Sequence, residues 1–329
     1  MNLSKFPRRR YSAGRTPIEK LERLSSALGG VNIYIKRDDL LGPAGGGNKI
    51  RKLEFLMADA LEKGADTIIT CGAVQSNHCR LTLAVSNQEG LPCHLVLKGE
   101  YNRHASGNNL LFDLLGAESI VNVPADSNLD DDMQNLADEL KAKGRKPYII
   151  PLGGTNEIGL LGYVACAQEI LQQAFEMGID IEHVVCTSGS GGTHGGLLAG
   201  FRGFDAPVPV TGISVYHKKD PQRDKLYVHC AEAANTLGIQ NRVTMDDVIV
   251  FDDYVGPGYA KVTKEMIDAV RLVAKTEAIF LDPVYTGKTM AGLIDFAKKG
   301  YFGSAKNILF LHTGGSPALY NFAGDFLGK

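Results

Sequence analysis

The chain has 329 residues, of which 44% are hydrophobic and 22% charged, and its net charge at pH 7 is −2. That composition is ordinary for a globular protein of about two domains, and the weak net charge argues against a nucleic-acid partner. The sequence has neither an apolar run long enough to span a membrane nor the apolar core of a signal peptide, so we expect no membrane partner and a cytoplasmic location.

Short apolar segments alternate with helical patterns along nearly the whole chain. This alternation predicts an α/β fold with mostly parallel sheets and helices on both faces. The predicted strands are residues 32–36, 67–71, 94–97, 119–123, 148–150, 183–187, 210–215, 248–251, 278–281 and 307–312. The predicted helices include residues 50–63, 77–88, 129–143, 162–177, 261–274 and 288–299. Ligands of such sheets bind beyond the carboxyl ends of strands, so we expect the functional site in the turns that follow strands.

The first candidate turn carries Lys49, which follows Gly45-Gly46-Gly47-Asn48 and opens an amphipathic helix. Glycines allow close approach of a ligand, and a helix N-terminus lowers the pKa of a nearby amine. Such an amine could form a Schiff base with an aldehyde cofactor, which would make the protein a pyridoxal-phosphate enzyme. Taken alone, however, the turn favours a solvated lysine beside a glycine loop that caps a surface helix.

The second turn, after the strand that ends at Cys71, contains Gln75-Ser76-Asn77. Ser76 or Asn77 is well placed to cap the next helix, and capping alone would explain both residues. The same helix start also offers backbone N–H groups and a hydroxyl to an anion such as a substrate carboxylate.

The third turn is the strongest local signal, because Ser188-Gly189-Ser190-Gly191-Gly192-Thr193 directly follows an apolar strand and precedes a helix. Successive N–H groups with serine and threonine hydroxyls form a phosphate-binding cradle. No Gly-Lys-Ser/Thr sequence follows, and His194 occupies the place of the third glycine of a dinucleotide fingerprint. A nicotinamide-dependent oxidoreductase is therefore a weaker alternative, and a non-catalytic sensor of a phosphorylated metabolite is another.

The fourth turn places Thr313 at a strand end, where its hydroxyl could bond a ring nitrogen; Gly314 and Gly315 follow it. A plain glycine turn before a helix opened by Pro317 is the simpler interpretation. Tyr259 and Tyr285 also lie in turn-like contexts and could donate an acid hydroxyl or only pack. The six cysteines and eight histidines have no metal-site spacing, so we expect no metal.

In this order, the motifs resemble those of the fold type II, or tryptophan-synthase-β-like, pyridoxal-phosphate enzymes. The resemblance is closest to the family that contains 1-aminocyclopropane-1-carboxylate deaminase and D-cysteine desulfhydrase, and it spans almost the whole chain. The residues that carry it are Arg15 to Glu19, Ile35 to Asp39, Lys49, Ser76-Asn77-His78, the Ser188 to Thr193 turn, Asp282-Pro283-Val284-Tyr285 and Thr313-Gly314-Gly315.

The resemblance implies a role for each candidate residue. Lys49 would carry pyridoxal 5′-phosphate covalently, Asn77 would meet its ring hydroxyl, and Thr313, with Thr286 nearby, would face its ring nitrogen. The catalytic residues would be Lys49, Ser76, Tyr259 and Tyr285, and the substrate carboxylate would lie against Gln75, Ser76 and Asn77. The phosphate would be held by Ser188, Gly189, Ser190, Gly191, Gly192 and Thr193.

One departure from the family pattern separates its two activities. The deaminases typically carry glutamate directly after the tyrosine of the Asp-Pro-Val-Tyr segment, whereas this chain has Thr286. A threonine would leave the ring nitrogen largely neutral, which suits expulsion of a good thiolate leaving group better than opening of a cyclopropane. The resemblance therefore implies α,β-elimination of D-cysteine to pyruvate, hydrogen sulfide and ammonia, with 1-aminocyclopropane-1-carboxylate deamination as the alternative.

The resemblance also implies two domains and a homodimer. Residues 1–49 and 162–329 would form the larger, cofactor-binding domain. Residues 50–161 would form a smaller inserted α/β domain, with the active site between the two.

Overall fold

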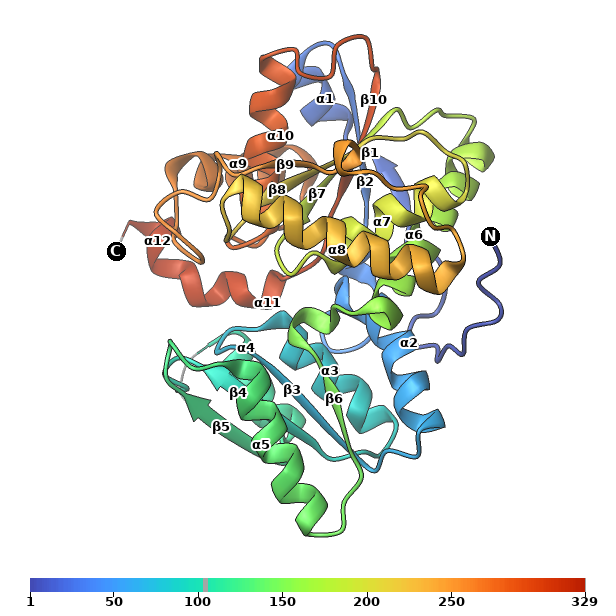
Figure 1. Cartoon of the computed structure of the whole chain (residues 1–329). Coiled ribbons are helices and arrows are strands. Elements are labelled where there is room, and N and C mark those ends of the chain that lie inside the picture. Colours follow the sequence, from blue (N-terminus) through green and yellow to red (C-terminus); the bar gives the residue numbers. More distant parts are fainter. Residues whose placement is uncertain (103–105, 329) are drawn as a thin grey trace.

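The computed structural model describes residues 1–102 and 106–328. Its strands form two separate sheets. Figure 1 shows the smaller sheet, with its helices, as a cyan-to-green unit below the rest of the chain. The larger sheet has the order β1-β2-β10-β7-β8-β9 and the smaller has the order β5-β4-β3-β6. Neighbouring strands in the described chain are parallel, except for the antiparallel pair β1 and β2. The predicted α/β class with mostly parallel sheets is confirmed.

The strands of the larger sheet are β1 (Ile18–Lys20), β2 (Asn32–Lys36), β7 (His183–Ser188), β8 (Val210–Ser214), β9 (Ile249–Phe251) and β10 (Asn307–Leu311). Those of the smaller sheet are β3 (Thr67–Ala73), β4 (Cys93–Lys98), β5 (Ser119–Val123) and β6 (Pro147–Ile150). The helices are α1 (Glu22–Leu28), α2 (Lys49–Glu62), α3 (Asn77–Gln88), α4 (Asn108–Leu115), α5 (Leu129–Ala142), α6 (Glu157–Met177), α7 (Gly192–Gly203), α8 (Lys219–Leu237), α9 (Lys264–Glu277), α10 (Thr286–Lys298), α11 (Ser316–Leu319) and α12 (Ala323–Leu327).

One predicted strand is wrong. Residues 278–281 alternate as a strand does, with Ile279 and Leu281 buried and Phe280 exposed, yet they form no ladder in the structure. Ala278 ends α9 with a positive φ of 55°, and the Phe280 carbonyl accepts a hydrogen bond from His312 Nε2 at 3.0 Å. The segment therefore packs into the core as extended chain, and its alternation reports burial rather than pairing.

Helix caps explain why two predicted helix starts are displaced. Helix α6 begins at Glu157, earlier than predicted, because the Asn156 side chain accepts from the Gly159 N–H at 2.8 Å. Helix α9 begins at Lys264, later than predicted, because the Thr263 hydroxyl accepts from the Met266 N–H. Side-chain acceptors of this kind satisfy the free N–H groups of a first turn and so set where a helix starts.

The predicted smaller domain contains all four strands of the smaller sheet, which lie between residues 67 and 150. Its predicted second boundary, after residue 161, falls inside the continuous helix α6. The division at residues 49/50 and 161/162 stays a prediction.

Helix α2, which starts at Lys49, crosses α6 at very short range. A Cβ on Gly162 would lie 2.3 Å from the Arg51 carbonyl oxygen, so only glycine allows this approach. The crossing fixes the helix that carries Lys49 against the longest helix described.

A cluster of charges also ties α2 to α6. Asp38 accepts from Arg51 through both carboxylate oxygens at 2.8 Å and from the Tyr163 hydroxyl at 2.7 Å. Glu169 bridges Arg51, at 2.9 Å, and Lys36, at 2.5 Å. Burial of Asp38 opposes its ionisation, but Arg51 and Lys36 outweigh burial and lower the pKa of this carboxyl to about 2. The cluster is thus ionised and internally compensated at neutral pH.

Within residues 1–102 and 106–328, no helix combines the length and the apolar composition needed to span a bilayer. The same residues contain no cluster of three or more histidine, cysteine, aspartate or glutamate side chains arranged to hold a metal ion.

Candidate active site

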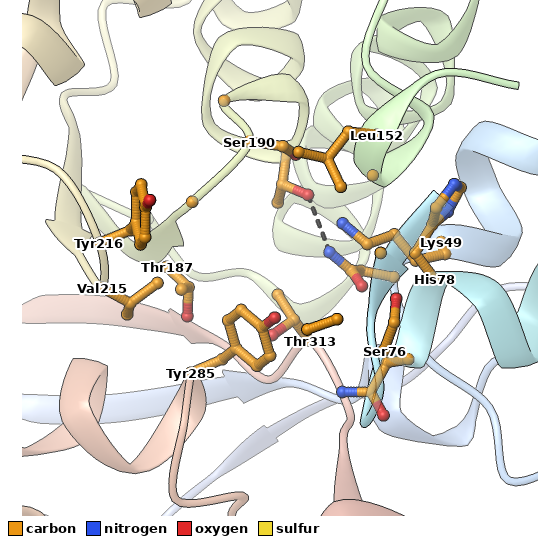
Figure 2. Close-up of a pocket in the computed structure, with 18 of the residues that line it drawn as sticks. Lys49, Ser76, His78, Leu152, Thr187, Ser190, Val215, Tyr216, Tyr285 and Thr313 are labelled. Atoms are coloured by element: carbon orange, nitrogen blue, oxygen red, sulfur yellow. Dashed lines mark hydrogen bonds between the residues drawn. The ribbon is translucent and has the colours of Figure 1, made fainter. Parts of the chain in front are cut away.

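A cavity of about 360 Å³ is lined by residues from both sheet-bearing parts of the chain. Figure 2 shows Lys49, Ser76, Ser190, Tyr285 and Thr313 arranged around this space. Each comes from the start of a helix or from the segment that follows a parallel strand. The turns singled out in the sequence therefore meet at one place, as the geometry of α/β sheets requires.

Lys49 is brought to the cavity by the glycine loop before it. Gly46 and Gly47 have positive φ values of 63° and 135°, and a Cβ on Gly46 would lie 2.4 Å from the Asp39 carbonyl oxygen. The loop can then approach the end of β10, where the Asn48 N–H donates to the Thr313 carbonyl at 3.0 Å. Burial lowers the pKa of Lys49 to about 8, so the uncharged, nucleophilic amine is accessible near neutral pH.

The turn after β7 forms the anion-binding side of the cavity. Gly191 precedes α7 with a φ of 99°, and Gly189, Ser190 and Thr193 line the space. The Thr193 hydroxyl accepts from Asn48 Nδ2 at 2.9 Å, which ties this turn to the residue beside Lys49. An N-terminal helix turn with flanking hydroxyls binds a phosphate group well.

Lys52 is a site residue that the sequence reasoning missed. Its side chain is fully buried and donates to the Gly153 carbonyl at 3.0 Å. Its Nζ lies 2.5 Å from where a Cβ on Gly192 would be, which puts the amine against the anion-binding turn. Burial and the nearby Lys49 and Lys225 amines lower its pKa well below the usual value. No carboxylate pairs with it in the part of the chain that the structure describes, so a bound phosphate would be the anion that favours the charged form of this amine.

A spacing rule was available to find Lys52. It lies three residues after Lys49 on the same helix, and residues three apart share a helix face. His78, which also lines the cavity, was noted only as part of a motif. Its Nε2 contacts the Thr70 hydroxyl at 2.8 Å, and burial lowers the pKa of the ring well below its usual range, so it is neutral.

The turn after β3 presents Ser76 and Asn77 to the cavity. The Ser76 hydroxyl caps α3 by accepting from the Cys79 N–H at 3.1 Å, so the predicted capping role is confirmed. The neighbouring Gln75 points elsewhere, because its side chain bonds the Ser106 carbonyl and the Asn108 N–H at the start of α4. Of the three predicted carboxylate ligands, the structure brings Ser76 and Asn77 to the cavity and leaves Gln75 beside it.

Tyr259 and Tyr285 line the cavity together, and their hydroxyl oxygens are 2.5 Å apart. Burial raises the pKa of both phenols. The nearby Tyr259 and Asp282 raise the pKa of Tyr285 further. Both side chains therefore keep their protons at neutral pH and can act as donors.

Three other predicted cofactor ligands do not line the cavity. Ser188 is buried, and its hydroxyl accepts from Gln222 Nε2 at 2.9 Å. Gly192 lies behind the anion-binding turn, against Lys52. Thr286 is buried, and its hydroxyl bonds the Asp282 carboxylate and N–H, each at 2.8 Å. The structure does bring the following predicted residues to the cavity: Lys49, Ser76, Asn77, Gly189, Ser190, Gly191, Thr193, Tyr259, Tyr285 and Thr313.

The Lys49 amine, whose pKa is lowered, lines one cavity together with a phosphate-binding turn, and a second lysine without a carboxylate partner among the described residues lies against that turn. This arrangement suits one class of ligand. That class is a phosphorylated carbonyl compound, which the amine attacks and the turn anchors. The sequence profile of the family described as "Pyridoxal-phosphate dependent enzyme" matches residues 10–314. The chain belongs to this family of pyridoxal-phosphate-dependent enzymes, and the alternative of a nicotinamide-dependent oxidoreductase loses its support.

Individual relatives cover nearly the whole chain. It is 45% identical to a D-cysteine desulfhydrase of Klebsiella pneumoniae strain 342, over 98% of each chain. It is 43% identical to a D-cysteine desulfhydrase of Salmonella typhimurium strain LT2, also over 98% of each. A crystal structure described as an ACC deaminase homologue superposes with a TM-score of 0.91 at 41% identity, covering 99% of this chain and 97% of that one. The structure of O-ureido-L-serine synthase, at 21% identity and a TM-score of 0.68, shares the fold.

Proposed function

We propose that this chain catalyses α,β-elimination of D-cysteine to pyruvate, hydrogen sulfide and ammonia. The observation that carries the proposal is the chemical character of the cavity wall. Among the residues that the structure describes, no carboxylate side chain lines the cavity. Loss of a thiolate, a good leaving group, needs less electron withdrawal than opening of an unactivated ring. Two relatives at 43% and 45% identity are named D-cysteine desulfhydrase, which supports the same choice of substrate.

Thr286 alone does not separate the two activities. The side chain of Thr286 is committed to Asp282 and lies outside the cavity wall. Asp282 is itself fully buried and accepts from the N–H groups of Val284, Tyr285 and Thr286. What matters for the ring nitrogen of the cofactor is that no acidic side chain among residues 1–102 and 106–328 lines the cavity, and Thr313 is then the proposed partner of that nitrogen.

The residues present fit the cofactor, and their proposed roles follow from their positions. Lys49 would hold it covalently, while Lys52 and the turn of Gly189, Ser190, Gly191 and Thr193 would hold its phosphate. When bound, pyridoxal phosphate supplies the electron sink that stabilises negative charge on the substrate α-carbon. The Lys49 amine, whose pKa is lowered to about 8 by burial, would be the base that takes the substrate α-proton.

The rest of the cavity orients the substrate and handles the leaving group. The start of α3 offers Ser76 and Asn77 to the substrate carboxylate, with the positive end of the helix behind them. Tyr259 and Tyr285 form a protonated pair with hydroxyls 2.5 Å apart, so one can donate a proton to the departing sulfur while the other supports it. The enantiomer preference would follow from the face of the substrate that Lys49 reaches.

Sulfide release from the two enantiomers of cysteine tests the proposal. The purified, cofactor-loaded enzyme should release sulfide and pyruvate from D-cysteine with a kcat/KM at least about tenfold above that for L-cysteine. Serving as a control, Lys264→Ala removes an exposed lysine on α9 and should leave both rates unchanged. Equal or greater activity on L-cysteine would contradict the assignment.

The homodimer and the cytoplasmic location also belong to the proposal. The family resemblance supports the homodimer, as do large exposed side chains near the C-terminus, such as Tyr320 at 70% and Leu327 at 68%. Exposed apolar groups of this size are common where a second subunit packs. Sedimentation velocity should give a particle of twice the 35.4 kDa chain mass, and a species of one chain mass at micromolar concentration would refute the dimer.

A further inference from the structure

Arg80 is a buried cation with no carboxylate partner among the described residues. It lies in the first turn of α3, three residues after Asn77, and its side chain has no exposure. Burial lowers the pKa of its guanidinium to about 10, which still leaves it charged at neutral pH. By contrast, Arg51, equally buried, is matched by Asp38 and Glu169. A buried charge without an opposite charge beside it lowers the stability of the fold, so its presence here indicates a role in the site.

Within the described chain, the hydrogen-bond partners of Arg80 are neutral oxygens from three segments beside the cavity. Its Nη1 donates to Asn77 Oδ1 at 2.8 Å and to Asn108 Oδ1 at 2.5 Å. Its Nη2 donates to the Gly46 carbonyl at 2.8 Å, in the loop that carries Lys49. One side chain thus joins the Lys49 loop, the start of α3 and the start of α4.

These contacts determine which way the Asn77 amide faces. A guanidinium can only donate, so the Asn77 atom turned toward it must be the oxygen. Asn108 Nδ2 donates to the same oxygen at 2.9 Å. The Asn77 NH₂ group, which has no partner in the described residues and belongs to a side chain that lines the cavity, is therefore left to donate into it.

We propose that Arg80 is a positioning residue that locks Asn77 as a hydrogen-bond donor to the ring oxygen of the bound cofactor and places a positive charge behind that donor. A donor backed by a cation favours an oxygen that carries negative charge. Arg80 would therefore stabilise the more negative of the protonation states of the bound cofactor. The inference rests on the cofactor-binding part of the proposed function and is independent of the identity of the amino-acid substrate.

The test follows the visible absorbance of the bound cofactor against pH, without amino acid present. In Arg80→Gln the pH midpoint of the band should rise by about one unit, because loss of a nearby cation disfavours the deprotonated form. Titration of the apo-protein with pyridoxal phosphate should also show about tenfold weaker binding, as expected for loss of a charged hydrogen bond. Arg80→Lys keeps the charge, so its midpoint should stay within about 0.3 units of wild type.

The titratable side chains that line the cavity are unchanged in the wild type and in both variants: Lys49, His78, Lys98, Tyr216, His217, Lys225, Tyr259 and Tyr285. Lys52, which lies against the anion-binding turn, is unchanged as well. Arg145→Gln is the matched control, because Arg145 bonds Thr67 and Asp66 within the same part of the chain and should leave both readouts unchanged.

A folded Arg80→Gln protein with the wild-type midpoint would overturn the inference. If this variant does not fold, Arg80→Lys decides, because an ammonium cannot reproduce the contacts of the guanidinium with three segments. About fivefold weaker cofactor binding in Arg80→Lys would support the inference, and unchanged binding would refute it. Neither readout needs turnover, so failure to act on D-cysteine would leave this test intact.

Discussion

Replacing Lys49 by alanine should reduce turnover by about 10³-fold or more, because one side chain both holds the cofactor and moves the substrate proton. The amine is unusual for a lysine in having its pKa lowered to about 8 by burial. Borohydride reduction followed by peptide mass analysis should place the cofactor on Lys49 in the wild-type chain and find no such adduct at position 49 in the variant.

The lysine that directly follows α2 provides the control. Lys63, just past the end of α2, is 64% exposed and pairs with Asp59, so Lys63→Ala should retain wild-type activity and labelling. Lys52 is the competing attachment point, because its amine also lies beside the anion-binding turn. An adduct on Lys52 in the wild-type protein would contradict the role assigned to Lys49.

Replacing Asp38 by asparagine should lower the free energy of unfolding by about 3 kcal/mol, because breaking a buried ion pair leaves an uncompensated charge. Arg51 would keep Glu169 as its remaining partner, which places the loss near the lower end of the range for such pairs. Denaturant unfolding of the apo-protein measures this directly. The exposed pair of Lys264 and Asp268 supplies the comparison, since Asp268→Asn should change the same quantity by less than about 0.5 kcal/mol.

The same carboxyl predicts how stability depends on acid. The pKa of Asp38 is about 2 in the folded protein and about 3.9 in an unfolded chain. Its contribution is therefore fully present above the unfolded value and is lost as the pH falls from about 4 through 2. Wild type should lose stability over this window more steeply than Asp38→Asn, and parallel curves for the two proteins would show that Asp38 is not the responsible group.

The sequence was sufficient to predict the class of fold and the turns of the site, because both depend on local pattern. Apolar strands followed by turns of glycine or small polar residues marked the ends of β3, β7 and β10, and those turns do meet at one cavity. The 278–281 segment shows the limit of this reasoning, since alternating burial looks the same in a strand and in extended chain that pairs with nothing.

Side-chain direction within a turn was harder to predict than the turn itself. Gln75 and Thr286 lie next to cavity residues in sequence, yet their polar atoms are taken by Asn108 and Asp282. Lys52 and Arg80 were overlooked because a charged residue in a helix is usually solvated. Only the packing of α2 and α3 shows that both are buried without a carboxylate partner in the described chain.

The most direct test of the account compares D-cysteine with 1-aminocyclopropane-1-carboxylate on the same cofactor-loaded enzyme. Because no acidic side chain of the described chain lines the cavity, elimination of thiolate should be much easier than opening of the three-membered ring. The account predicts pyruvate and sulfide from D-cysteine, with a kcat/KM at least about a hundredfold above that for 2-oxobutyrate formation. Production of 2-oxobutyrate at an efficiency equal to or above that of pyruvate would contradict it.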